Sequence, residues 1–279
     1  MARDSSRPWP GEMAGAVFKL YRATLHLQEL QREIAAYLSS QPHSTALYLD
    51  ASGRKYLLKG HLSHEPPEML PLIVGDCLQN MRVSLDHLAW ALAELGGKEP
   101  PRNTAFPIYI DEDAFHDQTK GGVLSARSGL GKMRALPKEA QTIIEGLQPY
   151  HGEDPSMHPL WVLNEYSRID RHRTLSIMYS LSDYTDFEIG KIDDAGNYAE
   201  ITNDEIDDLG LASGNFYDGT ELLWFTLKRP EKNVRVKYHS PLYIAFGQRY
   251  ISVGDPLERL SEIYDHIQDV ILPKFEKFF

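Results

Sequence analysis

Residues 75–90 read GDCLQNMRVSLDHLAW, and they are the most informative part of the sequence. Its apolar residues share one face of a 3.6-residue repeat, which predicts a helix packed against a core. Arg82 and His87, which are separated by four residues, interrupt this apolar pattern. Unpaired charge is costly to bury, so these side chains need partners, and such a set of ionisable groups indicates a site or a polar network.

Apolar periodicity predicts further elements on both sides of this helix. The helix itself should run from Pro67 to Leu95. Other helices are predicted at residues 12–39, 138–147, 159–181 and 256–277, a hairpin at 46–58, an extended piece at 106–110, and strands at 187–189, 222–227, 234–238 and 242–246. We therefore expect an α+β, mainly helical fold: a four-long-helix bundle with a small antiparallel β insertion between helices three and four.

The same pattern suggests four segments. Residues 1–11 should form a flexible lead, 12–185 the helical bundle with its N-terminal β-hairpin, 186–255 the β-rich insertion, and 256–279 the closing helix of the bundle. A Gly-rich, basic stretch at 120–132 lacks the Gly-Lys-Ser/Thr ending of a P-loop, so we expect a mobile loop there.

Composition narrows the classes of function. The chain has 279 residues and a formal net charge of -11, which argues against sequence-independent nucleic-acid binding over the whole surface. Acidic residues concentrate at 186–218, where a basic protein partner is expected to dock. The single cysteine, Cys77, allows no intramolecular disulfide, which favours a cytoplasmic protein. We expect no membrane span, no metal and, without a dinucleotide or P-loop fingerprint, no cofactor.

Polar residues gather on two predicted helices. On the first, Asp76, Asn80 and His87 share one narrow sector, whereas Arg82 and Asp86 point elsewhere and lie close to each other. The second helix carries the run 164–173, NEYSRIDRHR. We expect one polar centre between the two helices, with these members: Arg82, Asp86, His87, Glu165, Asp170, His172 and Arg173, supported by Asp76, Asn80 and Arg168.

Two interpretations of this centre come from the residues alone. In the structural interpretation, pairs such as Glu165 with Arg168 are hydrogen-bonded networks that fix helix register. In the metal interpretation, His87 and His172 converge with Asp76 or Glu165. The metal interpretation has little support, because the sequence contains neither Glu-x-x-His nor His-x3-His spacing.

A third interpretation comes from a family resemblance. Arg82-x4-His87 on a bundle helix resembles the signature of the HEPN superfamily, and the wider pattern resembles uncharacterised bacterial and phage proteins. The HEPN resemblance implies a metal-independent endoribonuclease that works as a homodimer on RNA. His87 would be the general acid/base, Arg82 would hold the scissile phosphate, and Asn80 and Asp86 would orient them. The alternative is a non-enzymatic scaffold or interaction protein whose polar centre is structural.

Overall fold

The structure is a computed structural model that describes residues 9–97, 99–119, 122–173, 175, 177–181, 186–239, 242–246 and 255–279. These residues form two compact units. The helical unit comprises the described parts of Met1–Arg32, Met69–Leu175 and Gln248–Phe279. The β unit comprises the described parts of Glu33–Glu68 and Ser176–Gly247.

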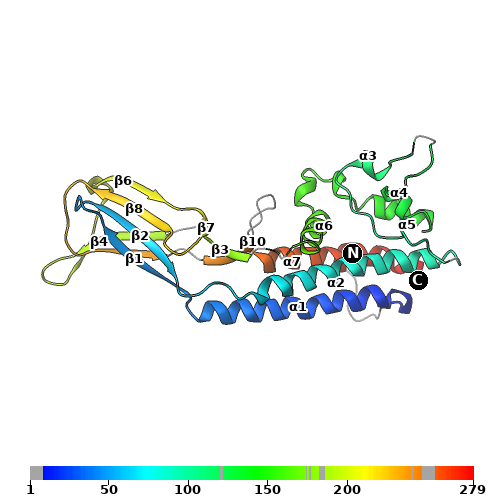
Figure 1. The fold of residues 1–279 in the computed structure, drawn as a ribbon, viewed down its shortest axis with the longest axis horizontal. Helices are drawn as coiled ribbons and strands as arrows, with labels where there is room; N and C mark the ends of the chain where they lie inside the picture. The colour runs from blue at the N-terminus through cyan, green and yellow to red at the C-terminus, as the bar shows by residue number, and fades with distance from the viewer. Residues whose placement is uncertain are drawn as a thin grey trace. The chain divides into compact units, whose positions relative to one another are not determined.

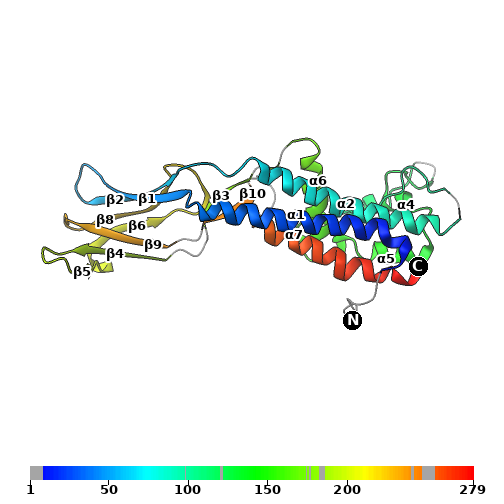
Figure 2. The same cartoon turned by 90° about the horizontal axis from the view of Figure 1, so that it is seen from below.

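Two long helices lie side by side in the helical unit, α1 (Ala14–Ser39) up to Arg32 and α2 (Met69–Glu94) (Figures 1 and 2). A short 3-10 turn, η1 (Gly11–Met13), precedes α1. Cys77 Sγ on α2 lies 3.6 Å from the Ala23 carbonyl oxygen, and Ser84 Oγ donates to the Ala16 carbonyl at 2.8 Å. Small residues on both helices therefore bring the two backbones close together.

Two shorter helices complete the core of this unit, α6 (Pro159–Asp170) and α7 (Pro256–Asp265). Both pack against α2 and against each other. α7 continues as a π-helical stretch, η5 (His266–Ile271), and two 3-10 turns, η6 (Leu272–Lys274) and η7 (Glu276–Phe278). Pro273 explains the change, because it cannot donate a backbone hydrogen bond to the preceding turn. The fully buried side chains include Leu78, Leu85, Leu163, Tyr166, Ile267 and Phe275.

Short helices follow α2 in the same unit: α3 (Glu112–Phe115), α4 (Gly129–Lys132), α5 (Lys138–Glu145) and the 3-10 turns η2 (Pro149–His151) and η3 (Pro155–Met157). The Ser128 side chain caps α4 by accepting from the Gly131 N–H at 3.0 Å. A Cβ on Gly131 would lie 1.9 Å from the Ser125 carbonyl oxygen. The described part of the Gly-rich stretch is therefore packed, and glycine permits a close backbone approach there.

The described residues of the β unit form three antiparallel sheets. The largest has the order β1 (His43–Leu49), β2 (Lys55–Leu62), β8 (Glu221–Leu227) and β6 (Ile206–Leu211), as Figure 1 shows. The second has the order β10 (Leu242–Phe246), β3 (Ile177–Leu181) and β7 (Gly214–Phe216). The third has the order β5 (Tyr198–Glu200), β4 (Asp186–Ile192) and β9 (Val234–His239), and a 3-10 turn, η4 (Asn203–Glu205), precedes β6.

Aromatic packing holds the largest sheet together. Tyr56 on β2 stacks on its cross-strand partner Phe225 on β8, with ring centroids 5.0 Å apart. Both side chains are buried, and such cross-strand pairs stabilise a sheet by up to about 1 kcal/mol. A Cβ on Gly60 would lie 2.1 Å from the ring of Phe216, so this glycine makes room for an aromatic side chain.

The expected four-long-helix bundle with a small β insertion is wrong, as is the description of the chain as a helical bundle. The helix expected at 159–181 ends at Asp170, and its last part forms β3. The predicted hairpin does form, as β1 and β2, but it pairs with β8, so two distant parts of the chain build one sheet. The run Ile177–Leu181, in which only Ser180 is polar, fits both helix and strand periods, and here the distant partner strands decided between them.

Two smaller observations complete the fold. The extended piece expected at residues 106–110 belongs to no sheet of the described chain. No helix among the described residues has both the length and the apolar character that a membrane span requires.

Candidate functional site

Arg82 lies mostly inside the helical unit, with 14% of its side chain exposed. Its Nη2 donates to Asp86 Oδ1 at 3.0 Å and to the Phe106 carbonyl oxygen at 2.7 Å. Burial lowers the pKa of Arg82, and the Asp86 carboxylate opposes that shift. The guanidinium is therefore held by interior partners of its own chain.

Asp86 completes a clamp on the backbone of Phe106. Its Oδ1 accepts from the Phe106 N–H at 3.0 Å, while Arg82 donates to the carbonyl of the same residue. The next residues are held similarly, since the Tyr109 N–H donates to Gln148 Oε1 and Gln148 Nε2 donates to the Pro107 carbonyl, both at 3.0 Å. Side chains thus supply the hydrogen-bond partners that a neighbouring strand would otherwise supply.

His87 lies on another side of α2 and is exposed. Its imidazole covers Gly15 on α1, where an added Cβ would be 2.6 Å from Nδ1. This ring lines a groove of about 490 Å³ within the helical unit. We call it the His87 groove, and its lining residues are Glu12, Gly15, Asp86, His87, Trp90, Ala91, Glu94 and Thr104. Arg82 is not among them.

The His87 groove carries negative charge. Glu12 and Glu94 contribute carboxylates, the carboxylate of Asp86 is paired with Arg82 behind the groove, and no lysine or arginine occurs among the described residues that line it. Trp90 Nε1 donates to Glu94 Oε1 at 3.0 Å, which fixes the indole at the edge of the groove. Such a surface attracts cations and repels phosphate groups.

The remaining predicted site residues on α2 and α6 form local contacts. Arg168 donates to Glu165, with Nη2 and Oε2 2.6 Å apart. The Asp170 carboxylate lies against Gly75, and burial followed by the nearby Asp76 charge raises the pKa of Asp170. Asn80 Nδ2 donates to the Asp76 carbonyl at 2.8 Å.

The segment after α6 exposes its basic residues. Arg171, His172 and Arg173 are all exposed, and Arg171 lies close enough to Arg82 to lower the pKa of that guanidinium further. No hydrogen bond or ion pair in the described chain joins His172 to His87. Nor does any group of three or more His, Cys, Asp and Glu side chains among the described residues form a metal site.

No protein-family model, curated protein or solved structure matches the chain.

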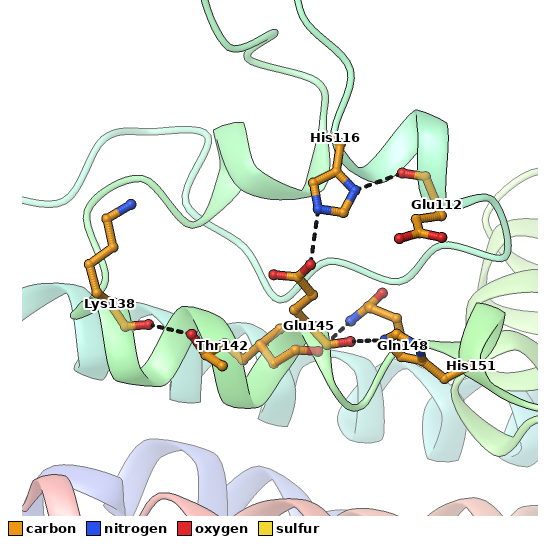
Figure 3. Close-up of polar contacts among 8 residues, drawn as sticks. Glu112, His116, Lys138, Thr142, Glu145, Gln148 and His151 are labelled. Atoms are coloured by element: carbon orange, nitrogen blue, oxygen red, sulfur yellow. Dashed lines mark hydrogen bonds and ion pairs between the residues drawn. The ribbon is translucent and has the colours of Figure 1, made fainter.

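A second polar cluster, not anticipated from the sequence, surrounds His116 (Figure 3). Its Nδ1 lies 3.0 Å from the Glu112 carbonyl oxygen, and its Nε2 lies 2.9 Å from Glu145 Oε1. Both partners are acceptors, so the doubly protonated imidazolium satisfies both contacts. The Glu112 carbonyl and then Glu145 raise the pKa of His116. The ring joins the end of α3 to α5. In the sequence, only the four-residue spacing between Glu112 and His116 could have suggested that these two residues meet on a helix.

A histidine pair in the helical unit has the opposite character. His158, the N-cap of α6, accepts from the Leu160 N–H through Nδ1 at 3.2 Å. Its ring meets that of His266 edge to face, with centroids 5.0 Å apart. Burial and the His158 ring lower the pKa of His266 to about 4. The buried Nε2 of His266 has no hydrogen-bond partner among the described residues, so this imidazole stays neutral near pH 7.

Proposed function

We propose that this chain is a non-enzymatic interaction protein in which Arg82 and Asp86 are architectural. One observation carries the proposal: the Arg82 Nη2 that a nuclease would direct at phosphate donates instead to Asp86 and to the Phe106 carbonyl. Releasing that guanidinium would leave two acceptors without their donor, which is unfavourable in a largely buried site. The clamp therefore docks the segment around Phe106 on α2.

The charge of the His87 groove supports the same proposal. An RNA-cleaving site must attract a polyanion, and basic side chains usually provide that attraction. The groove instead presents carboxylates from Glu12, Asp86 and Glu94. A binding surface for a cationic partner fits these residues better than a binding surface for RNA.

A HEPN-like endoribonuclease remains the second candidate, and one observation favours it. His87 is exposed and lines a groove, as a general acid/base requires. In this proposal a second copy of the chain would bring the cations that the groove lacks, and Arg82 would have to leave Phe106 when RNA binds.

The experiment that separates the two candidates is RNA cleavage by the purified full chain in EDTA, with thermal melts of every variant. The interaction protein predicts no cleavage, and a lower melting temperature for Arg82→Met. The matched control is His151→Ala, which alters another exposed histidine of the helical unit. Our proposal would be overturned by metal-independent cleavage that is lost in His87→Ala but persists in His151→Ala, provided that both variants melt at the wild-type temperature.

The acidic residues of the β unit offer a second surface for a basic partner. Several are already engaged, since Asp207 faces Arg54 at 3.7 Å and Glu188 binds Lys237 at 2.6 Å. The exposed carboxylates of residues 186–218 with no ion pair inside the described chain are Asp186, Asp193, Asp194, Glu200, Asp204 and Asp208. We propose that a partner docking at 186–218 would use this subset. The buried, single Cys77 is compatible with our proposal of a reducing, cytoplasmic compartment.

A further inference from the structure

We infer that the His87 groove binds the guanidinium of an arginine side chain presented by a basic protein partner. This inference rests on the proposed interaction function and names the chemistry of the partner. The groove, its charge and its aromatic edge all lie within the helical unit. Each of these three features favours the same planar cation.

Free carboxylate oxygens provide the first argument. Glu12 makes no hydrogen bond or ion pair with other described residues. Asp86 uses Oδ1 for both of its bonds, to Arg82 and to the Phe106 N–H, which leaves Oδ2 available. Glu94 uses Oε1 for the Trp90 indole, which leaves Oε2 available. Three carboxylates with unused acceptors therefore line one groove.

The aromatic edge provides the second argument. Trp90 is 38% exposed, an unusual degree for so large an apolar side chain on a core helix. Its N–H is anchored on Glu94, one helical turn further along α2, so the ring is held in one orientation. The electron-rich face of an indole attracts a cation placed over it.

The combination selects a guanidinium over other ligands. Phosphate and carboxylate ligands would face like charges, and an apolar ligand would leave the carboxylates desolvated. A guanidinium can donate to two carboxylates in its plane while its face stacks on an indole, whereas an ammonium is a strongly hydrated point charge. Thr104 adds a further polar group, a buried hydroxyl oxygen that has no partner among the described residues.

The test follows the indole N–H signals of the full chain by NMR while a blocked Gly-Arg-Gly peptide is added. The chain has four tryptophans, and loss of one signal in Trp90→Phe identifies the signal of Trp90. We expect a saturable shift of the Trp90 signal. A Gly-citrulline-Gly peptide, which is nearly isosteric but uncharged, should leave that signal in place. A Gly-Lys-Gly peptide should bind more weakly than the arginine peptide.

Charge-neutralising variants then locate the site. Glu12→Gln and Glu94→Gln should each weaken binding of the arginine peptide by about threefold or more, since each removes an ionic hydrogen-bond acceptor. The amide oxygen introduced by Glu94→Gln can still accept from the Trp90 N–H, so the indole stays anchored. The matched control is Glu153→Gln, an exposed acidic residue of the helical unit outside the groove. It has the same effect on net charge and should bind as wild type does.

Three outcomes would overturn the inference. The first is a Trp90 signal that the arginine peptide does not shift. The second is equal binding of the citrulline peptide, and the third is equal weakening by Glu153→Gln and Glu12→Gln. A single-stranded RNA oligonucleotide, added in a separate titration, distinguishes this failure from failure of the proposed function. If RNA shifts the Trp90 signal and the arginine peptide does not, both the arginine site and the proposed interaction function fail. If neither RNA nor the peptide shifts the signal and Arg82→Met still lowers the melting temperature, only the arginine site fails.

Discussion

Arg82 and Asp86, one turn apart on α2, hold opposite polar groups of a single residue, the carbonyl and the N–H of Phe106. Two hydrogen bonds therefore link the helix to the segment, and a third, 3.0 Å long, joins Arg82 to Asp86 within the helix. The two side chains of this salt bridge supply the backbone of Phe106 with the hydrogen-bond partners that a neighbouring β-strand would supply in a sheet. Phe106 itself is fully buried, so the clamp fixes an apolar anchor as well as a backbone position.

Loss of the Arg82 guanidinium should weaken folding. Arg82→Met leaves Asp86 and the Phe106 carbonyl without their donor, and we expect the free energy of unfolding to fall by about 2–4 kcal/mol. Denaturant unfolding measures this change. Asp86→Asn should cost less, because an amide oxygen can still accept from the Phe106 N–H. Equal stability of wild type and Arg82→Met would show that the clamp is not architectural.

His116 should make the protein less stable as the solution becomes alkaline. Its pKa is raised in the folded state, so its contribution is fully present below the unfolded value of about 6.5 and is lost as pH rises through the higher folded value. His116→Gln should flatten the denaturant midpoint over this range, from about pH 6 upward. His172→Gln, which changes an exposed histidine of the helical unit outside this cluster, serves as the control. A wild-type pH profile in His116→Gln would contradict the prediction.

His266 should have the opposite effect, on the acid side. Its folded pKa of about 4 lies below the unfolded value, so the unfolded chain binds the proton first and stability falls as pH drops from about 6.5 towards 4. The loss should be on the order of 3 kcal/mol. Denaturant unfolding of wild type and His266→Phe between these values measures it, since phenylalanine cannot titrate. The idea fails if both proteins lose stability equally over that range.

Gly75 should resist substitution because α6 approaches it closely. An added Cβ would lie 2.5 Å from Asp170 Oδ1, so Gly75→Ala must displace that carboxylate. We expect a net loss of roughly 1–2 kcal/mol, even though alanine favours helix over glycine. Thermal or denaturant unfolding checks the value. Gly11→Ala, which meets nothing within 4 Å, is the control, and adding Asp170→Ala to Gly75→Ala should restore stability.

Local sequence signals located several elements well. The apolar periodicity at 12–39 and 67–95 predicted the long helices that form as α1 and α2, and the turn residues around Gly53 predicted the β1–β2 hairpin. These elements are determined by contacts between residues near one another in the chain. Ile177–Leu181 was misassigned because its strand partners, β10 and β7, begin more than thirty residues further along.

The candidate site divides in the same way. Helical geometry alone predicted that Arg82 and Asp86 lie close together, and the two side chains are hydrogen-bonded in the structure. It also placed His87 apart from Asp86, whereas both residues line the same groove. The sequence could not show that Phe106 would be their common partner, since the chain between Asp86 and Phe106 leaves α2 after Glu94 and then follows an irregular path. Nor could it show that Glu12 would line the same groove as His87.

Local patterns in the sequence were enough to predict the two long helices, the hairpin and the closeness of Arg82 and Asp86, because each depends on a repeat of a few residues. The acidic net charge follows from composition. Only the tertiary structure decided which strands pair, that the Arg82 guanidinium is buried against Phe106, and that His87 lies exposed in an acidic groove. Those outcomes depend on which segments, far apart in the chain, bury their apolar surfaces against each other, and a local sequence pattern does not identify the distant partner.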